Sequence, residues 1–481
     1  MVTAMLGWRR LALCASLLLP CGSSQAVDPF VTGKLVAAQA HALTSGEQDD
    51  FSCDFAAPTA VLELAEAIER ALCAHPETRA AWAQARIQAA QLGVARGAYL
   101  PQLQASVGRL EQKSSTRYGN PYDLLDKTEP RTRTGNLKLS WTIADSGLRS
   151  ATVDQARALL DAANASHDAS IQATLLNAAK RYFDVQTAAA VLRASEQAER
   201  SARQNLEATS AMYEAGASAL TDKLQAAVAY SDAELKRVSA LGELQTLTGS
   251  LASILGLPPN TRLQLPARDL ELPASGAGVA IEQLLDDARQ HHPLVKASRA
   301  ELEAARARVR AVRAEGRPTL TFTAEASERR QDKHIPVYNA APTTMVLRDK
   351  VIGMQLSIPL FEGFTRSYKT QAASSQVDKL EAELERREQE VALDVWKHYQ
   401  ALHTRQAHIA AARTLQDSAQ RSYEVAEGRY RAGVGNILEL LSAQDARARA
   451  EQKRIEALAG WLSARLQLAA SVGKLGLWAI R

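Results

Sequence analysis

Residues 212–224 read MYEAGASALTDKL, and residues 429–441 read RYRAGVGNILELL. Each stretch has a Tyr three residues before a Gly and an apolar residue four positions after it, and 217 positions separate the two copies. Glycine ends helices readily because it adopts the left-handed conformation that closes the last turn. The stretch therefore predicts one feature twice: a helix that ends, a tight turn and a helix that returns.

The same offset of 217 residues recurs along most of the chain, which indicates duplication of a whole unit. The matching positions are His75-Pro76 with His292-Pro293, Pro101 with Pro318, Ser140 with Ser357, Tyr182 with Tyr399, and Gly256 with Gly473. A period this long lies outside the range of solenoid repeats. We therefore expect a first unit at residues 59–256, a linker rich in Pro and Gly at 257–280, and a second unit at 281–481.

Very long helices are expected in both units, at residues 148–210 and 366–431. A helix of that length extends about 95 Å. Apolar residues in it recur at steps of three and four, as at Leu175, Ala178 and Tyr182, which is typical of a coiled coil. An Ala-rich helix precedes the strand segments of each unit, at residues 59–96 and 281–313. Aromatic residues make up only 5% of the chain, which suits close packing through small side chains.

Four segments alternate apolar and polar residues, at 98–110, 134–144, 319–328 and 351–360. A period of two places the apolar side chains on one face of a strand. About ten residues suffice for a tilted strand to cross a bilayer, and polar loops are expected at 114–132 and 329–350. Two half-buried hairpins of a soluble sheet would show the same alternation.

An oligomer follows if these strands face lipid. Four strands cannot close a barrel, and open strand edges are not tolerated in hydrocarbon. Two chains would give eight strands around a filled interior, and three chains would give twelve strands around a lumen. The expected fold is therefore mainly α with membrane β: a duplicated helix–hairpin–long-helix unit, with four strands per protomer of a shared 12-stranded β-barrel that continues into an α-helical barrel.

The N-terminus resembles a secretory signal peptide over residues 1–26, with Arg9 and Arg10 before an apolar stretch at 11–19. Lipid modification at Cys21 is the alternative, which Pro20 disfavours. Residues 27–58 would then form an N-terminal periplasmic segment, and no later stretch has 18 consecutive apolar residues. Cys53 and Cys73 remain as either a disulfide or two separate buried thiols.

Composition and motifs exclude several function classes. The formal net charge of +4 falls by two with the signal peptide, and no basic patch is interleaved with aromatics, so nucleic acid is not an expected partner. Metalloprotease, CxxC and phosphate-loop motifs are absent from the sequence, so we expect no enzyme, metal or cofactor. His291-His292 could be a metal pair, but a helix-boundary role is favoured.

The paired turns and the SIPLFEG stretch at 357–363 resemble the TolC outer-membrane factor family over nearly all of the mature chain, and within it the type I secretion branch. The resemblance implies a homotrimeric duct in the outer membrane of a Gram-negative bacterium, with its helical part in the periplasm. Implied partners are outer-membrane lipid, a periplasmic membrane-fusion adaptor, an inner-membrane ABC transporter and an exported protein, of RTX toxin type. A drug or metal efflux duct is the alternative, and a soluble periplasmic adaptor a second one, disfavoured by the two hairpins.

The resemblance also implies a gate at the periplasmic tip. Thr221 and Asp222 match positions where the family's closing hydrogen bonds originate, Tyr430 matches a partner, and Glu439 matches a lumen carboxylate. Gly435 and Ser442 depart from the pattern, where an arginine and a second carboxylate would stand. Turn geometry alone offers another explanation, since Gly216 and Gly433 end helices and Asn436 with Glu439 fits a capping box.

Overall fold

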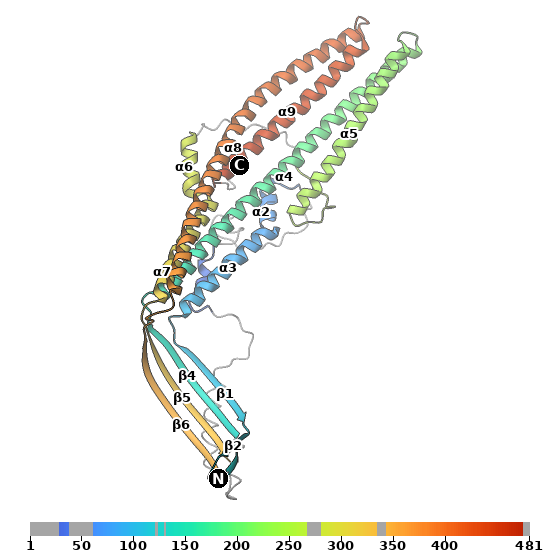
Figure 1. The fold of residues 1–481 in the computed structure, drawn as a ribbon. Helices are drawn as coiled ribbons and strands as arrows, with labels where there is room; N and C mark the ends of the chain where they lie inside the picture. The colour runs from blue at the N-terminus through green and yellow to red at the C-terminus, as the bar shows by residue number, and fades with distance from the viewer. Residues whose placement is uncertain are drawn as a thin grey trace.

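A computed structural model describes residues 28–37, 61–120, 124–128, 131–266, 280–333 and 343–474. A four-stranded sheet occupies one end of the molecule and two long helical hairpins extend away from it (Figure 1). The expected signal peptide and Cys53 lie outside the described residues. A short 3-10 helix, η1 (Thr32–Leu35), lies in the N-terminal segment.

The helices repeat at the offset found in the sequence. Each helix of the second unit begins 217 residues after its counterpart, at 281, 293, 365 and 437 against 64, 76, 148 and 220. The pairs are α2 (Leu64–Ala74) with α6 (Ile281–His291), α3 (Pro76–Gly97) with α7 (Pro293–Glu315), α4 (Leu148–Glu214) with α8 (Thr365–Arg431), and α5 (Leu220–Ile254) with α9 (Ile437–Ser471). The long helices α4 and α8 have 67 residues each, or about 100 Å.

The single Ala-rich helix expected at the start of each unit is wrong, because each is two helices. His75 and His292 have extended backbones, with ψ of 124° and 125°, and each precedes a proline at the first position of the next helix. Proline excludes the helical conformation from the residue before it and suits the first helical position. The Nδ1 atom of His292 accepts a hydrogen bond from the Leu294 amide at 3.3 Å, which confirms the helix-boundary role.

The sheet has the order β1-β4-β5-β6, with every neighbouring pair antiparallel. Its strands are β1 (Gln102–Glu111), β4 (Arg131–Ala144), β5 (Thr319–Lys333) and β6 (Thr343–Ser357). The central β4–β5 pairing joins the two units, and β1 and β6 are the outer strands. Both edges of the described sheet are therefore left without a strand partner.

The strands run further from the helices than expected. β5 continues to Lys333 and β6 begins at Thr343, within the segment 329–350 that was expected to be a loop. The segment 114–132 likewise contains β2 (Ser114–Tyr118) and β3 (Leu124–Thr128), which form a ribbon of their own. Backbone hydrogen bonding needs no apolar side chains, so a ladder can outlast the alternation that reveals it in the sequence.

The sheet separates its side chains into an apolar and a polar face. Leu103, Leu139, Ala324 and Ile352 lie in one cross-strand row, whereas the next row contains Gln104, Lys138 and Glu325. On the apolar face Val107 is 85% exposed and Ile352 is 77% exposed. Since exposed apolar surface of this extent is rare in soluble proteins, the apolar face needs a non-aqueous environment.

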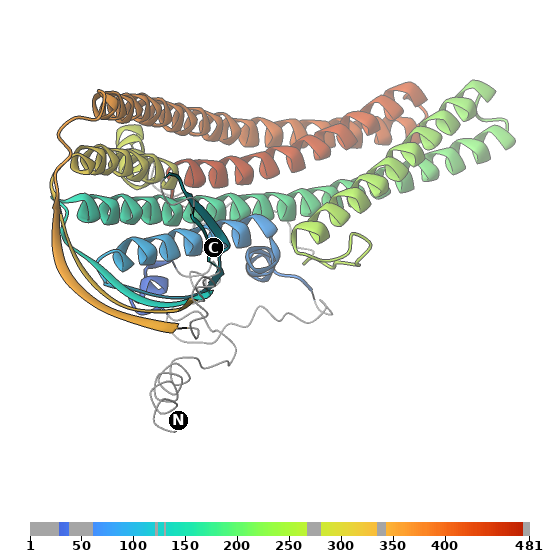
Figure 2. The same ribbon diagram turned by 60° about the horizontal axis from the view of Figure 1, so that its bottom comes forward.

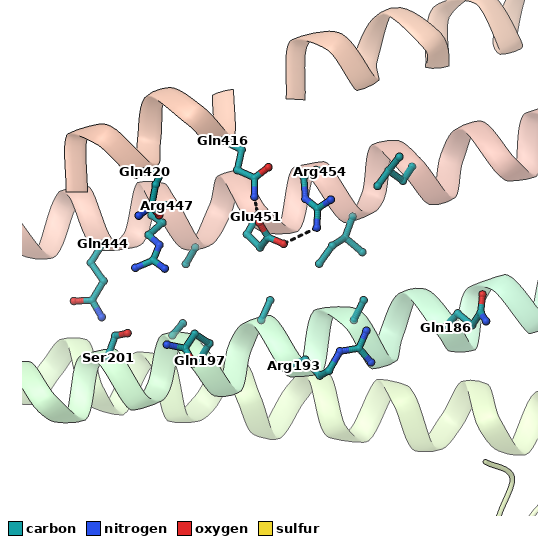
Figure 3. A pocket seen from close by; sticks show the side chains of 16 residues that line it. Gln186, Arg193, Gln197, Ser201, Gln416, Gln420, Gln444, Arg447, Glu451 and Arg454 are labelled. Atoms are coloured by element: carbon teal, nitrogen blue, oxygen red, sulfur yellow. Dashed lines mark hydrogen bonds and ion pairs between the residues drawn. The ribbon is translucent and has the colours of Figure 1, made fainter. Parts of the chain in front are cut away.

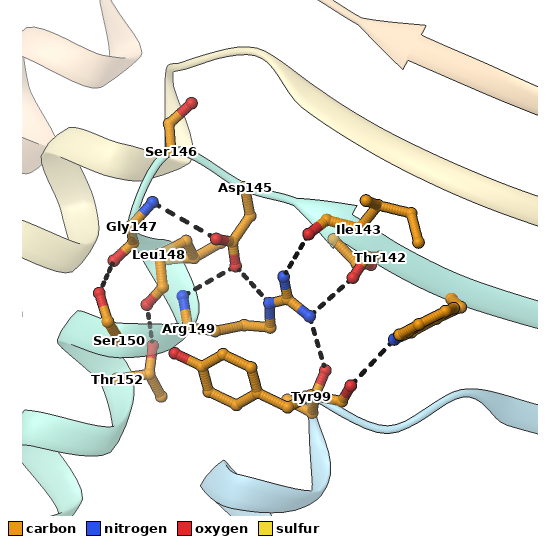
Figure 4. Close-up of polar contacts among 12 residues, drawn as sticks. Tyr99, Thr142, Ile143, Asp145, Ser146, Gly147, Leu148, Arg149, Ser150 and Thr152 are labelled. Atoms are coloured by element: carbon orange, nitrogen blue, oxygen red, sulfur yellow. Dashed lines mark hydrogen bonds and ion pairs between the residues drawn. The ribbon is translucent and has the colours of Figure 1, made fainter.

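Arg149 fixes the corner where the sheet meets the helices (Figure 4). Its guanidinium donates to the carboxylate of Asp145 at 2.8 Å and to the carbonyls of Thr142 at 2.7 Å and Ile143 at 3.2 Å. It also lies over the Tyr99 ring, 4.6 Å from the centroid. A β-bulge between Thr142 and Ala144 frees the carbonyls for this contact. One cation thereby ties β4, α4 and the end of α3 together.

The main core lies where α2 packs on the long helix α4, as Figure 2 shows. Tyr182 is 2% exposed, and its hydroxyl donates to the Leu62 carbonyl at 3.0 Å. The segment after α5 also packs here, because the Leu62 amide donates to the Gln264 carbonyl at 2.8 Å. Asn164 fastens the N-terminal segment to α4 by bonding the Ala37 amide and the Leu35 carbonyl.

We expect the helical part to lose stability in mild acid. His167 on α4 is 1% exposed, its Nδ1 has no hydrogen-bond partner in the described structure, and burial lowers its pKa. Burial also lowers the pKa of His292 and His398. A histidine with a lowered pKa binds fewer protons when folded, so stability falls as the pH drops from about 6.5 through the lowered value.

Thermal unfolding of the purified protein at pH 7.5 and pH 5 measures this loss. The variant His167→Leu should show a smaller difference between the two pH values, whereas substitution of the exposed His408 by Gln should leave the difference unchanged. Burial raises the pKa of the neighbouring Asp168, which stabilises in the opposite direction, but in a lower pH range. Equal stability of the unsubstituted protein at both pH values would contradict the expectation.

Candidate gate at the helical tips

The two hairpin tips have the same backbone structure. Gly216 and Gly433 have φ of 72° and 73°, in the left-handed region. The amides of Ala217 and Val434 reach back to the carbonyls of Met212 and Arg429, at 2.8 Å and 3.1 Å. This is the Schellman closure of a helix C-terminus, which glycine adopts without steric cost. Both tip glycines therefore sit where the sequence predicts a turn.

Thr221 and Asp222 lie in the first turn of α5, at the tip of the first hairpin. Asp222 accepts a hydrogen bond from the Ser218 hydroxyl at 3.2 Å, and Thr221 is exposed. A carboxylate here is favoured by the partial positive charge of the helix N-terminus. Asp222 thus serves its own turn within one chain, with its carboxylate half-buried beside the second hairpin's side of the molecule left for other partners.

Tyr430 connects the two hairpins. It lies near the end of α8, and its hydroxyl contacts the Met212 sulfur at 3.9 Å near the end of α4. Within the described chain the structure therefore brings Tyr430 to the first hairpin but pairs it with Met212, while Asp222 pairs with Ser218. Neither Met212 nor Ser218 was identified from the sequence, since a thioether and a hydroxyl in a turn carry no recognisable motif.

Glu439 and Asn436 share the start of α9 differently from the expected capping box. Asn436 caps the helix, because its side-chain oxygen accepts from the Leu438 amide at 3.0 Å. Glu439 turns to Arg429 across the hairpin, with 3.8 Å between the carboxylate and Nε. Both charged side chains are about half exposed, so the pair contributes little to stability.

Gly435 has a steric reason for its departure from the family pattern. A Cβ atom at this position would lie 2.8 Å from the Tyr430 amide nitrogen and 3.0 Å from the Arg429 carbonyl carbon. An arginine could not stand here unless the turn shifted. The second hairpin therefore lacks that cation because the chain folds its turn tightly against the end of α8.

A polar cavity of about 350 Å³ separates the hairpins behind the tips (Figure 3). Arg193 faces it from α4, and Arg447 and Arg454 face it from α9. Glu451 accepts from Arg454 at 3.0 Å. On either side the hairpins are joined by polar contacts, Asn205 with Gln444 at 2.5 Å and Lys236 with Asp445 at 3.2 Å. Polar contacts around a cavity can be exchanged for others more easily than a packed apolar core.

The model of the family described as outer membrane efflux protein matches residues 67–257 and again residues 284–474. The two matches are offset by 217 residues, as the helices are. The chain belongs to the outer membrane efflux protein family. Proteins of this family are outer-membrane channels, so the chain lies in the outer membrane with its helical part in the periplasm.

Two relatives and one solved structure show the extent of the likeness for this outer membrane efflux protein. It is 32% identical to protein CyaE of Bordetella pertussis over 416 residues, which covers 86% of this chain and 85% of CyaE. It is 27% identical to the alkaline protease secretion protein AprF of Pseudomonas aeruginosa over 254 residues, about half of each chain. The fold matches the outer membrane protein VceC of Vibrio cholerae with a TM-score of 0.71 at 19% identity, covering 85% of this chain and 96% of VceC.

These findings confirm the expected fold class: a mainly helical chain with a few strands, like channels that have a β-barrel part and a helical barrel. Among the helices of the described residues, none is both long enough and apolar enough to cross a membrane.

Proposed function

We propose that three copies of this chain form the outer-membrane duct of a type I secretion system that exports a protein. The observation that carries the proposal is the sheet with two unpaired edges and an exposed apolar face, attached to hairpins of about 100 Å. The sequence resemblance to the type I secretion branch and the relative named for protease secretion support a protein as cargo. Its partners would be a periplasmic adaptor and an inner-membrane ABC transporter.

The internal duplication indicates how the copies meet. Within the chain β4 of the first unit pairs with β5 of the second. The equivalent contact joins β6 of one copy to β1 of the next, since β6 corresponds to β4 and β5 to β1. Applied to the helices, the packing of α4 on α9 predicts that α8 of one copy packs on α5 of the next. Repetition of one contact closes a ring, and three copies give twelve strands and a lumen.

Deletion of the gene tests the cargo. We expect the deletion to abolish release of one secreted protein, with that protein retained in the cell, and complementation to restore it. The alternative is an efflux duct, which the description of the family supports. Unchanged protein release together with increased drug or metal sensitivity would contradict secretion and establish efflux.

We propose that Asp222 and Tyr430 help to hold the periplasmic tip closed, with Thr221 and Glu439 lining the same region. Their supporting observations are the position of all four at the tips and the Tyr430 contact between hairpins. Asp222→Ala and Tyr430→Phe should each raise single-channel conductance in planar bilayers several-fold. Glu439→Gln should change conductance less, because its carboxylate pairs within its own hairpin. Unchanged conductance of correctly assembled Asp222→Ala and Tyr430→Phe channels would leave these residues with turn capping alone.

We also propose that Cys53 and Cys73 are joined. Cys73 on α2 is disulfide-bonded, and its partner lies outside the described residues. After removal of residues 1–26, Cys53 is the other cysteine of the sequence. Alkylation without reductant should leave the mass of the mature protein unchanged, and Cys53→Ser should expose one thiol and cost about 3 kcal/mol. Two alkylated thiols in the unreduced protein would contradict the pairing.

A further inference from the structure

Three arginines stand in one row across three neighbouring strands. Arg109 of β1 is directly opposite Arg133 of β4, which is directly opposite Arg330 of β5. Directly opposed residues of antiparallel strands point to the same face, about 5 Å apart, and like charges in such positions repel. A row of three guanidinium groups is therefore unfavourable unless an anion lies beside it.

The row lies on the apolar face of the sheet. Side chains two residues apart share a face, so Arg109 follows Val107, Arg133 precedes Leu137 on the same face, and Arg330 follows Ala326. The neighbouring residue Arg329 points to the opposite, polar face. The arginine row thus belongs to the surface that turns outward from the barrel, and cargo in the lumen would not meet it.

The height of the row matches the far edge of the membrane. From Leu320, where β5 leaves the helices, to Arg330 is ten residues, or about 33 Å along the strand. At a tilt of about 40° this is a height of about 25 Å, which is that of the apolar band of an outer-membrane strand. Trp141 and Phe322 mark the helix-proximal end of the same face. The arginines therefore lie at the level of the outer-leaflet headgroups.

Carboxylates near the row leave its centre unneutralised. Glu111 pairs with Arg109 at 2.6 Å. Glu328 lies 3.0 Å from Arg348 but 3.7 Å from Arg330. Arg133 has no carboxylate within ion-pair distance in the described part of the chain, and the Nε atom of Arg330 is buried without a hydrogen-bond partner there. Unused donors thus lie at the centre and at one end of the row.

We propose that the row of Arg109, Arg133 and Arg330 binds the phosphate groups of a lipid in the outer leaflet. Arginine presents a planar fork of donors that fits phosphate oxygens, and it is less strongly hydrated than lysine. Basic clusters at a membrane surface recognise anionic headgroups in this way. This inference rests on the proposed arrangement of the sheet as a barrel with its apolar face toward lipid.

The experiment measures lipid binding to the purified, assembled full-length channel by native mass spectrometry in detergent. The probes are lipid A, lipid A from which the phosphates have been removed, and inorganic phosphate. We expect lipid A to bind at least about tenfold more tightly than its dephosphorylated form, and Arg133→Gln to remove about tenfold of that affinity, the value of a charge-assisted contact. Arg133→Lys should lose less, because it keeps the charge but not the fork.

Arg329→Gln is the matched control, because it removes the same charge from the adjacent residue on the opposite face. It should keep lipid binding within about twofold of the unsubstituted channel, whereas an equal loss in Arg329→Gln and Arg133→Gln would overturn the proposal. Equal binding of both lipid forms, or equally tight binding of inorganic phosphate, would also overturn it. If Arg133→Gln fails to assemble, Arg109→Gln takes its place. Failure of lipid binding in a channel that still conducts would leave the proposed duct intact.

Discussion

Val228→Asp is expected to abolish assembly of the channel while leaving the protomer folded. Val228 is 71% exposed on α5, where Leu220, Leu224, Leu235 and Val238 form an exposed apolar stripe along one face. The corresponding positions on α9, Ile437 and Ile455, are 2% and 5% exposed because α9 packs against α4. The stripe on α5 therefore needs a covering helix, which quasi-equivalence identifies as α8 of the next copy.

The chain itself shows that a carboxylate at this position is compatible with the hairpin. The residue that corresponds to Val228 in the second unit is Asp445, which pairs there with Lys236 at 3.2 Å. In the subunit interface an aspartate would be buried without a partner, at a cost of at least about 3 kcal/mol for each contact. That cost lowers the association constant more than a hundredfold at every interface.

Heat-modified electrophoretic mobility and sedimentation in detergent measure the assembly. We expect Val228→Asp to be monomeric with an unchanged helical circular dichroism spectrum, and Val228→Thr, which keeps the shape without the charge, to remain trimeric. A trimer formed by Val228→Asp would show that the α5 stripe does not lie between subunits. Loss of helix content would instead show that the substitution damages the protomer.

Arg149→Met is expected to lower the stability of the protomer by about 3–5 kcal/mol, the usual cost of breaking a buried ion pair. The Arg149 and Asp145 side chains are 13% and 10% exposed, and their separation is 2.8 Å. Removal of the guanidinium leaves the Asp145 carboxylate without its counter-charge. It also leaves the carbonyls of Thr142 and Ile143 without their donor.

The second unit provides the control for this substitution. Arg366 corresponds to Arg149 and pairs with Glu362 at 3.0 Å, but these side chains are 36% and 44% exposed. An exposed pair contributes about 0–1 kcal/mol, so Arg366→Met should have little effect. Urea unfolding of the two variants in detergent compares them directly. Equal losses would mean that burial of the Arg149 contact does not determine its strength.

Much of the fold could be predicted because it depends on local regularities. The offset between Tyr213 and Tyr430 revealed the duplication, and alternation around Leu139 and Leu356 revealed the strands. The candidate site was less accessible to prediction. Gly216 and Gly433 could be identified as turn residues from their effect on the backbone. The partners Met212 and Ser218 could not, because a hydrogen bond between residues far apart in the chain follows only from how the helices pack.

The sequence by itself determined the duplicated unit, the helix ends and the two faces of each strand, because propensity and periodicity act over a few neighbouring residues. Only the tertiary structure decided that β4 pairs with β5 across the two units, since strand pairing depends on contacts between distant segments. The same pairing aligned Arg109, Arg133 and Arg330, three residues that are far apart in sequence. It also buried Arg149 but not Arg366, because the bulge at Thr142 turns free carbonyls toward the first corner.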